Sequence, residues 1–260
     1  MSKYFITITL ILLWMSTLAQ QNDSFQLVDL HIHLKGGFAI EDAITKSDKE
    51  NVKYGIAVNC GIGFPIQNDH QLDSVVIHMK KFPQFFIGMQ AEGREWVDLF
   101  SKESITKFDY VFTDAMTFVD MKGRRNRIWL EDETYIDNEQ QFMDDLVVLI
   151  VKIISTEPIN IYVNPTYLPE RIASKYNELW TECRMDKVIQ AAKKHEVAIE
   201  INNRFKIPSL KFILKAKNAG VKFTIGTNNI DGNFAGPNYA REMINECGLS
   251  KPDFFVPTRK

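Results

Sequence analysis

Residues 26–33 read QLVDLHIH, a run in which polar side chains alternate with apolar ones. Alternation with a period of two is typical of a β-strand, and it places Asp29, His31 and His33 on one face. The apolar residues between them face the other way. We expect this strand to begin a sheet whose interior carries the odd-numbered positions, with the two imidazoles at its carboxyl end.

The same rhythm of a short strand followed by a helical stretch continues along the chain. The strands expected from it are 26–33, 54–59, 86–92, 109–114, 160–164, 197–202 and 222–227. Amphipathic segments lie between them, at 40–51, 72–81, 140–154, 185–195 and 209–219. Strands that alternate with helices build parallel sheets with right-handed crossovers. The pattern favours a single-domain α/β fold, a (β/α)7 TIM-like barrel, over residues 20–260. The Lys35-Gly36-Gly37 turn lacks the glycine spacing of an open dinucleotide-binding sheet.

Composition describes an ordinary folded chain. Of 260 residues, 45% are hydrophobic and 25% charged, and the formal net charge is −2. A nearly neutral chain does not bind nucleic acid through bulk electrostatics. We therefore expect a small-molecule substrate and no nucleic-acid partner; the composition leaves the oligomeric state open.

The first nineteen residues have the layout of a cleaved secretory signal. A short start with Lys3 precedes the apolar run 6–15, and small residues precede a cut between Ala19 and Gln20. The apolar run is shorter than the roughly 20 residues of a membrane span, so we expect no stable membrane insertion after cleavage. The predicted location is periplasmic or secreted. Export permits disulfides: a Cys183–Cys247 pair and three free thiols, Cys60 included, are both compatible with the sequence.

Polar side chains stand at the carboxyl end of every expected strand, where the sites of such barrels lie. They are His31, His33, Asn59, Gln90, Glu92, Asp114, Asn164, Glu200, Asn202 and Asn228. Two inward imidazoles suit a divalent transition metal such as Zn, Mn or Fe, with the carboxylates of Glu92 and Asp114 as further ligands. The alternatives are a pair of core histidines, and carboxylates that cap helices or pair with Arg94.

Residues 28–33 resemble the first motif of the PHP (polymerase and histidinol phosphatase) family of metal-dependent hydrolases. The opening of the amidohydrolases is similar, but their barrels have eight strands and further histidine ligands. Here seven strands are expected, and Asn164 and Asn202 occupy those later ends. The resemblance therefore implies a PHP-type barrel.

This chain departs from the PHP pattern after the first motif. The family's Thr-Asp-His reads Asn59-Cys60-Gly61, and its third-motif Glu falls at Gln90 or Glu92. A mononuclear or at most binuclear centre is thus expected in place of a trinuclear one. Residues 198–204 are similar to the family's Glu-bearing strand, which implies Glu200 as general acid or base, beside Asp114 as a catalytic carboxylate.

Cations and amides near the strand ends are the candidate substrate contacts. Lys35, Arg94 and Arg204 suit a phosphate or carboxylate. The amides of Asn164, Asn202 and Asn228 suit a sugar. The basic run 121–127 fits either an anion site or a solvated loop.

The sequence predicts an exported metal-dependent hydrolase that uses a metal-activated water on a phosphate ester or a small carbohydrate-type substrate. Two alternatives belong to other classes. One is a metal-poor barrel that binds a sugar without hydrolysing it, and the other is a metal-dependent isomerase or lyase acting on a sugar derivative. Metal content separates the binding protein from both enzymes, and product analysis separates the enzymes.

Overall fold

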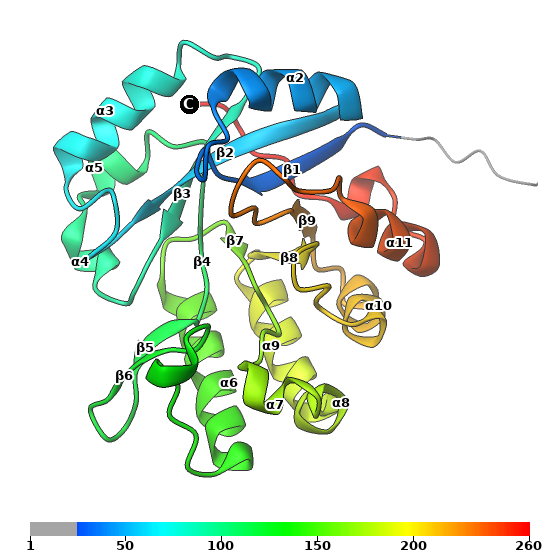
Figure 1. Ribbon diagram of the computed structural model, residues 1–260. Helices are drawn as coiled ribbons and strands as arrows, with labels where there is room; N and C mark the ends of the chain where they lie inside the picture. The colour runs from blue at the N-terminus through cyan, green and yellow to red at the C-terminus, as the bar shows by residue number, and fades with distance from the viewer. Residues whose placement is uncertain (1–24) are drawn as a thin grey trace, which may run out of the picture.

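Seven parallel strands pair edge to edge and close into a barrel (Figure 1). The computed structural model describes residues 25–260, so the predicted signal segment lies outside the described residues. In barrel order the strands are β1 (Leu27–Ile32), β2 (Val52–Cys60), β3 (Phe86–Ala91), β4 (Tyr110–Thr113), β7 (Ile161–Tyr162), β8 (Ala198–Asn202) and β9 (Phe223–Gly226). The last strand pairs with the first through Asp29 and Ile225. The predicted seven-stranded α/β barrel is confirmed.

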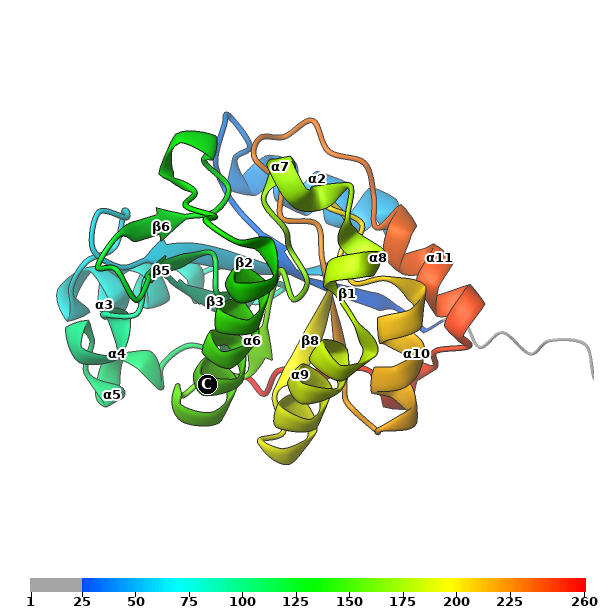
Figure 2. The same ribbon diagram turned by 90° about the horizontal axis from the view of Figure 1, so that it is seen from below.

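Helices surround the barrel, as the view from below shows (Figure 2). They are α2 (Ile40–Glu50), α3 (Asp69–Met79), α4 (Trp96–Leu99), α5 (Lys102–Ile105), α6 (Glu139–Thr156), α7 (Glu170–Ala173), α8 (Tyr176–Leu179), α9 (Glu182–Lys194), α10 (Leu210–Asn218) and α11 (Asn238–Cys247). Helices α3, α6, α9 and α10 begin at side-chain caps, for example Asn138 before α6 and Ser209 before α10, which accept bonds from backbone amides. None of the helices in residues 25–260 is both long and apolar enough to cross a membrane.

The long segment after β4 holds an antiparallel hairpin that the sequence did not predict. Its strands are β5 (Thr117–Val119) and β6 (Arg125–Arg127). The basic run forms its turn and second strand, where Arg124 pairs with Asp120 at 2.7 Å and Lys122 pairs with Asp137 at 2.9 Å. Because Lys122, Arg124 and Arg127 pair with carboxylates in the hairpin or just after it, most of the charge of the run is neutralised at the surface.

Strand β1 contains a bulge that determines how the histidines point. Asp29 is opposite Tyr54 and Ile32 is opposite Ile56, so β1 has one residue more than β2 over this interval. Leu30 packs in the inner cluster of the barrel, and the next residue, His31, has its ring 4.6 Å from that of Phe112 in the same cluster. The expectation that only odd positions face inward is therefore wrong below the bulge. Bulges redirect side chains in this way beside functional sites.

Two clusters of buried apolar residues support the strand ends. The larger lies between the strands and the helices, and the smaller fills the barrel around Tyr110 and Phe112. The chain's last residues join the smaller cluster through Phe255, whose amide donates to Phe223 O. The barrel is thus a packed core, and its polar side chains collect at one end.

Candidate functional site

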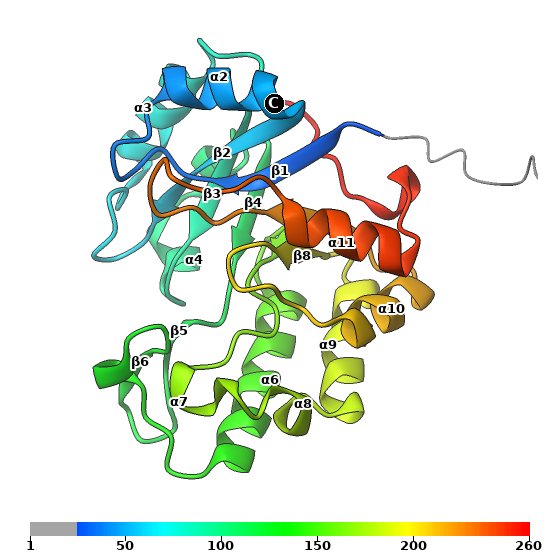
Figure 3. The ribbon, with the colours of Figure 1, turned by 45° about the vertical axis from the view of Figure 1, so that its right-hand side comes forward.

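His31 and His33 lie at the carboxyl end of β1 and are almost fully buried, with 1% and 2% of their surface exposed. Their ring centroids are 5.1 Å apart, and the rings meet edge to face. The loop after β9 holds this end of β1 in place, because Asn229 Oδ1 accepts from His33 N at 2.7 Å and Asn229 Nδ2 donates to His33 O at 2.9 Å. Figure 3 shows that loop beside the start of the segment after β1. The two imidazoles are therefore fixed through their backbone as well as by packing.

Among the described residues, each imidazole has a hydrogen-bond partner on one nitrogen only. His31 Nδ1 lies 2.5 Å from Glu200 Oε1, and His33 Nδ1 lies 2.9 Å from Ala57 O. A carboxylate and a carbonyl both accept, which places the ring protons on Nδ1 and leaves a lone pair on each Nε2. Both Nε2 atoms are buried and have no hydrogen-bond partner in the described residues. An imidazole whose Nδ1–H is held by a carboxylate or carbonyl and whose Nε2 is unpaired is the usual arrangement of a metal ligand.

Glu200 stands behind His31. Its Oε1 contacts the imidazole of His31. Its Oε2 accepts from the backbone N of Asn164 at 2.8 Å and from the side-chain Nδ2 of Asn202 at 2.9 Å. The carboxylate is fully buried, and both oxygens are bonded. Glu200 is therefore placed to orient His31, and its role as general acid or base stays a prediction.

The three asparagines predicted to hold a sugar bond to one another. Asn164 Oδ1 accepts from Asn202 Nδ2 at 2.9 Å and from Asn228 Nδ2 at 3.2 Å, and Asn164 Nδ2 donates to Asp114 Oδ2 at 2.9 Å. Asn164 and Asn228 also adopt left-handed backbone conformations (φ 49° and 52°), which asparagine tolerates better than most residues. Asn164 and Asn202 thus donate to the carboxylates of Asp114 and Glu200, and Asn228 donates to Asn164. Sugar binding by the three amides stays a prediction.

Glu92 and Asp114 are two buried carboxylates that influence each other. Burial, and then the charge of Asp114, raise the pKa of Glu92 to about 8. Burial also raises the pKa of Asp114, while hydrogen bonds from Met116 N and Asn164 oppose the shift. A buried pair of like charges favours a bound cation or a retained proton. The other contact of Glu92 is Asn59 Nδ2, which donates to Oε1 at 2.7 Å.

Gln90 is a neighbour of the histidines that the sequence left secondary to Glu92. Its Oε1 is buried and has no partner among the described residues. Burial lowers the pKa of His33, followed by the charges of His31 and Lys35, whereas the neighbouring side chain of Gln90 opposes the shift. Gln90 thus faces His33. The strand register accounts for this position. In β3, Gln90 lies opposite Asn59 of β2 and Phe112 of β4, two residues before Glu92 in the sequence.

The three predicted anion-binding cations have different surroundings. Arg94 Nη1 donates to Glu157 Oε1 at 2.8 Å and Nη2 donates to Thr113 Oγ1 at 2.7 Å, so it pairs with Glu157, and its contact with substrate stays a prediction. Lys35 and Arg204 form no salt bridge with a described residue. Burial, and then the charge of Arg204, lower the pKa of Lys35, while Glu92 opposes the shift. The charges of Arg204 and Glu92 thus both reach Lys35.

The two histidine nitrogens suit a divalent cation. Two buried Nε2 lone pairs and a buried amide oxygen have no partner within residues 25–260. In the same part of the chain, no three His, Cys, Asp or Glu side chains stand close enough to form a ready metal cage. The structure therefore brings His31 and His33 together but does not join Glu92 and Asp114 to them as a preformed ligand set.

The sequence missed the side chains that hold the backbone of this site. Asp29 is fully buried and accepts from His31 N, Thr227 N and the Thr227 hydroxyl. Burial raises its pKa to about 6, and these bonds oppose the shift. Asp29 on the histidine strand and the Thr227-Asn228-Asn229 run after a buried strand were the available signals.

All three cysteines are free, with Cys60 and Cys247 buried and Cys183 exposed.

Comparison with known proteins agrees with the fold. No family model and no curated protein matches the chain. A solved histidinol phosphate phosphatase from Lactococcus lactis subsp. lactis Il1403, in complex with zinc, L-histidinol and phosphate, is similar with a TM-score of 0.60. The sequences are 15% identical, and the match covers 87% of this chain and 95% of that one. An HpcH/HpaI aldolase from Desulfitobacterium hafniense DCB-2 is 10% identical over 87% of this chain and 94% of that one; its TM-score of 0.41 supports no conclusion.

Proposed function

We propose that this protein is an exported PHP-type hydrolase that depends on a divalent metal and cleaves phosphate esters. The observation that carries the proposal is the pair His31 and His33, whose Nδ1 atoms are held and whose buried Nε2 atoms have no partner in residues 25–260. Core histidines that serve packing alone bond both nitrogens or expose one. Leaving two such lone pairs side by side costs free energy unless a ligand uses them.

Zn, Mn or Fe would be held by His31 and His33, with Glu92 as the proposed third ligand. A carboxylate adds charge neutralisation that the amide of Gln90 lacks. The bound cation would supply Lewis acidity toward the ester and a more acidic water. Glu200 orients His31, and Asp114, whose pKa burial raises, is the proposed residue that holds or moves a proton.

The anionic part of the substrate is assigned to Lys35 and Arg204. Neither has a carboxylate partner among the described residues. The charge of Arg204 lowers the pKa of Lys35, and the charge of Lys35 opposes the rise in the pKa of Glu92. Adjacent unpaired cations at the mouth of a barrel favour a dianion such as a phosphate monoester. The zinc and phosphate in the similarly folded phosphatase are consistent with this proposal.

Phosphate release tests the function. The purified protein, with Zn²⁺ or Mn²⁺ added, is assayed on a panel of phosphate monoesters, before and after treatment with a chelator. We expect turnover that the chelator abolishes and metal restores, and at least a hundredfold loss of kcat/KM in His33→Ala. Bound metal without turnover of any ester would overturn the proposal. A product formed without release of phosphate would then favour an isomerase or lyase.

A further inference from the structure

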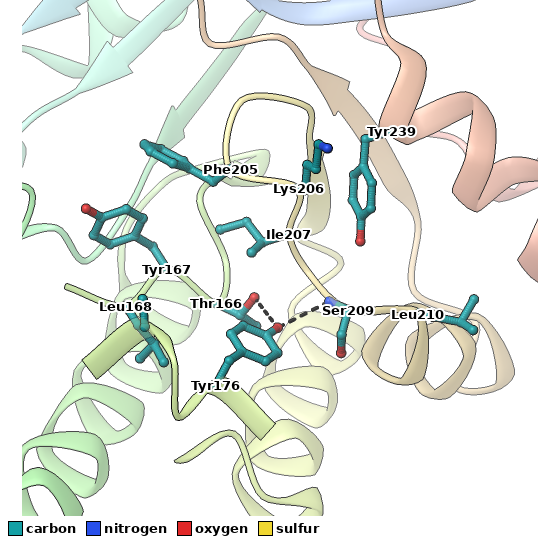
Figure 4. A pocket seen from close by; sticks show the side chains of 11 residues that line it. Thr166, Tyr167, Leu168, Tyr176, Phe205, Lys206, Ile207, Ser209, Leu210 and Tyr239 are labelled. Carbon is teal, nitrogen blue, oxygen red and sulfur yellow. Dashed lines mark hydrogen bonds between the residues drawn. The ribbon is translucent and has the colours of Figure 1, made fainter. Parts of the chain in front are cut away.

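A cavity of about 490 Å³ lies between the loop after β7 and the loop after β8 (Figure 4). Both loops follow the carboxyl ends of their strands, so the cavity opens on the same end of the barrel as the histidines. Aromatic rings make up much of its wall, with Tyr167 and Phe205 on one side and Tyr239 on the other. The volume is within the range of small-molecule sites.

Most polar groups of the wall are already bonded to the protein. Tyr176 Oη donates to Thr166 Oγ1 at 2.7 Å and accepts from Ser209 N at 3.2 Å, and Tyr239 Oη donates to Pro208 O at 2.6 Å. A polyhydroxylated ligand needs many free donors and acceptors, because its buried hydroxyls must be satisfied. This wall instead offers ring faces and aliphatic surface. It favours a flat, apolar occupant.

Arg204, one of the two cations assigned to the substrate anion, lies beside the cavity. Its guanidinium carbon lies 4.9 Å from the centre of the Phe205 ring, and that ring meets Tyr167 edge to face with centroids 4.8 Å apart. The charge of Arg204 also lowers the pKa of Lys35 and opposes the rise that burial gives the pKa of Tyr167. Arg204 therefore lies against the aromatic wall of the cavity, and its charge reaches Lys35.

We propose that this cavity binds the aromatic part of an organic anion whose acidic group lies against Arg204 and Lys35. The inference rests on the proposed function in one respect, since it takes the anion to be the phosphate of the ester. The substrate class it names is aryl-bearing phosphate monoesters. Stacking on Phe205 and Tyr167 and contact with Tyr239 would select the ring.

Binding of two phosphonates, which cannot be hydrolysed, tests the inference without turnover. Calorimetric titration of the purified protein with phenylphosphonate and methylphosphonate gives a ratio of dissociation constants. We expect phenylphosphonate to bind at least about tenfold more tightly, because its ring leaves water and stacks. A ratio near one, or no binding of either compound, would overturn the inference.

Three variants localise the preference. Phe205→Leu removes the flat ring and should lower the ratio about three- to tenfold. Ala173→Trp fills the cavity from an exposed lining position and should bring the ratio near one without removing any core side chain. Tyr135→Leu is the matched control, since Tyr135 lies under Arg124 in the same cation–π arrangement but outside the cavity, and the ratio should hold. An unchanged ratio in both cavity variants contradicts the assignment.

The two proposals fail separately. A phenyl preference that Phe205→Leu and Ala173→Trp reduce, in a protein that hydrolyses no ester, supports the cavity and overturns the phosphatase. Hydrolysis of alkyl and aryl phosphates with equal KM, together with a phosphonate ratio near one, supports the phosphatase and overturns the cavity.

Discussion

The two imidazoles at the end of β1 are held by different acceptors. His31 meets the carboxylate of Glu200, whereas His33 meets the backbone carbonyl of Ala57. A carboxylate makes the imidazole a stronger donor to a metal and also fixes its tautomer. The contribution of His31 to metal affinity should therefore depend on the side chain of Glu200.

Glu200→Gln tests this dependence. The amide keeps the shape of the side chain but loses the charge that holds the Nδ1 proton, so zinc affinity should fall about ten- to a hundredfold in a titration against a competing chelator. Asp144→Asn, the same change of group at the Arg184 ion pair on α6, should leave zinc affinity within threefold. Unaltered affinity in Glu200→Gln would contradict the dependence of metal binding on the Glu200 carboxylate.

Glu92 and Gln90 compete for the role of third ligand. We expect Glu92→Gln to weaken metal binding at least tenfold through loss of a charged ligand, and Gln90→Ala to change it only a few-fold. The buried, unpaired Oε1 of Gln90 makes the opposite result chemically reasonable. If Gln90→Ala abolishes binding and Glu92→Gln does not, the centre lies one layer deeper in the barrel.

At the scale of elements, alternation and helical spacing predicted all seven barrel strands and the five long helices named from the sequence. The bulge in β1 could not be predicted from the sequence. An extra residue in one strand is defined only by its pairing with the next strand, and neither segment alone shows that Asp29 lies opposite Tyr54. Helices of four residues, such as α4 and α7, are too short to show a period. The β5–β6 hairpin was read as a loop because charges fill it.

Candidate residues were predictable by type but not by role. The polar ends of the strands do gather at one end of the barrel, and His31 and His33 do stand together. Which groups face the ligand and which hold a neighbour depends on distances across strands. The sequence therefore could not show that Glu200 bonds to His31 and Asn164, or that Arg94 pairs with Glu157.

Gly226 at the end of β9 tests the fit between strands. A Cβ there would clash with Glu200 Oε1 and lie 2.9 Å from His31 Cβ. Gly226→Ala should therefore displace the Glu200–His31 pair and weaken zinc binding at least tenfold. Gly236→Ala is the control, because its nearest atom would be Glu50 Oε2 at 3.4 Å, an ordinary contact. Equal zinc affinities for the two variants would show that the Glu200–His31 contact is unimportant.

For the whole molecule, the barrel gives one packed body with a polar end, and the proposed export adds a cleaved leader. Expressed with its first nineteen residues in an exporting host, the protein should be recovered with Gln20 at its amino terminus. Intact-mass measurement of the exported chain checks this. A mass that retains Lys3 would contradict the cleavage, and protein recovered only inside the cell would contradict export.

The metal content of the purified protein tests the central claim, that the His31–His33 pair holds a divalent cation. Elemental analysis after gel filtration should find about one Zn, Mn or Fe per chain. His31→Ala and His33→Ala should each lower that content at least tenfold. His78→Ala on α3 and His195→Ala at the end of α9 should keep it. Full metal content in both mutants of the pair, or none in the wild-type protein after exposure to all three metals, would contradict the account.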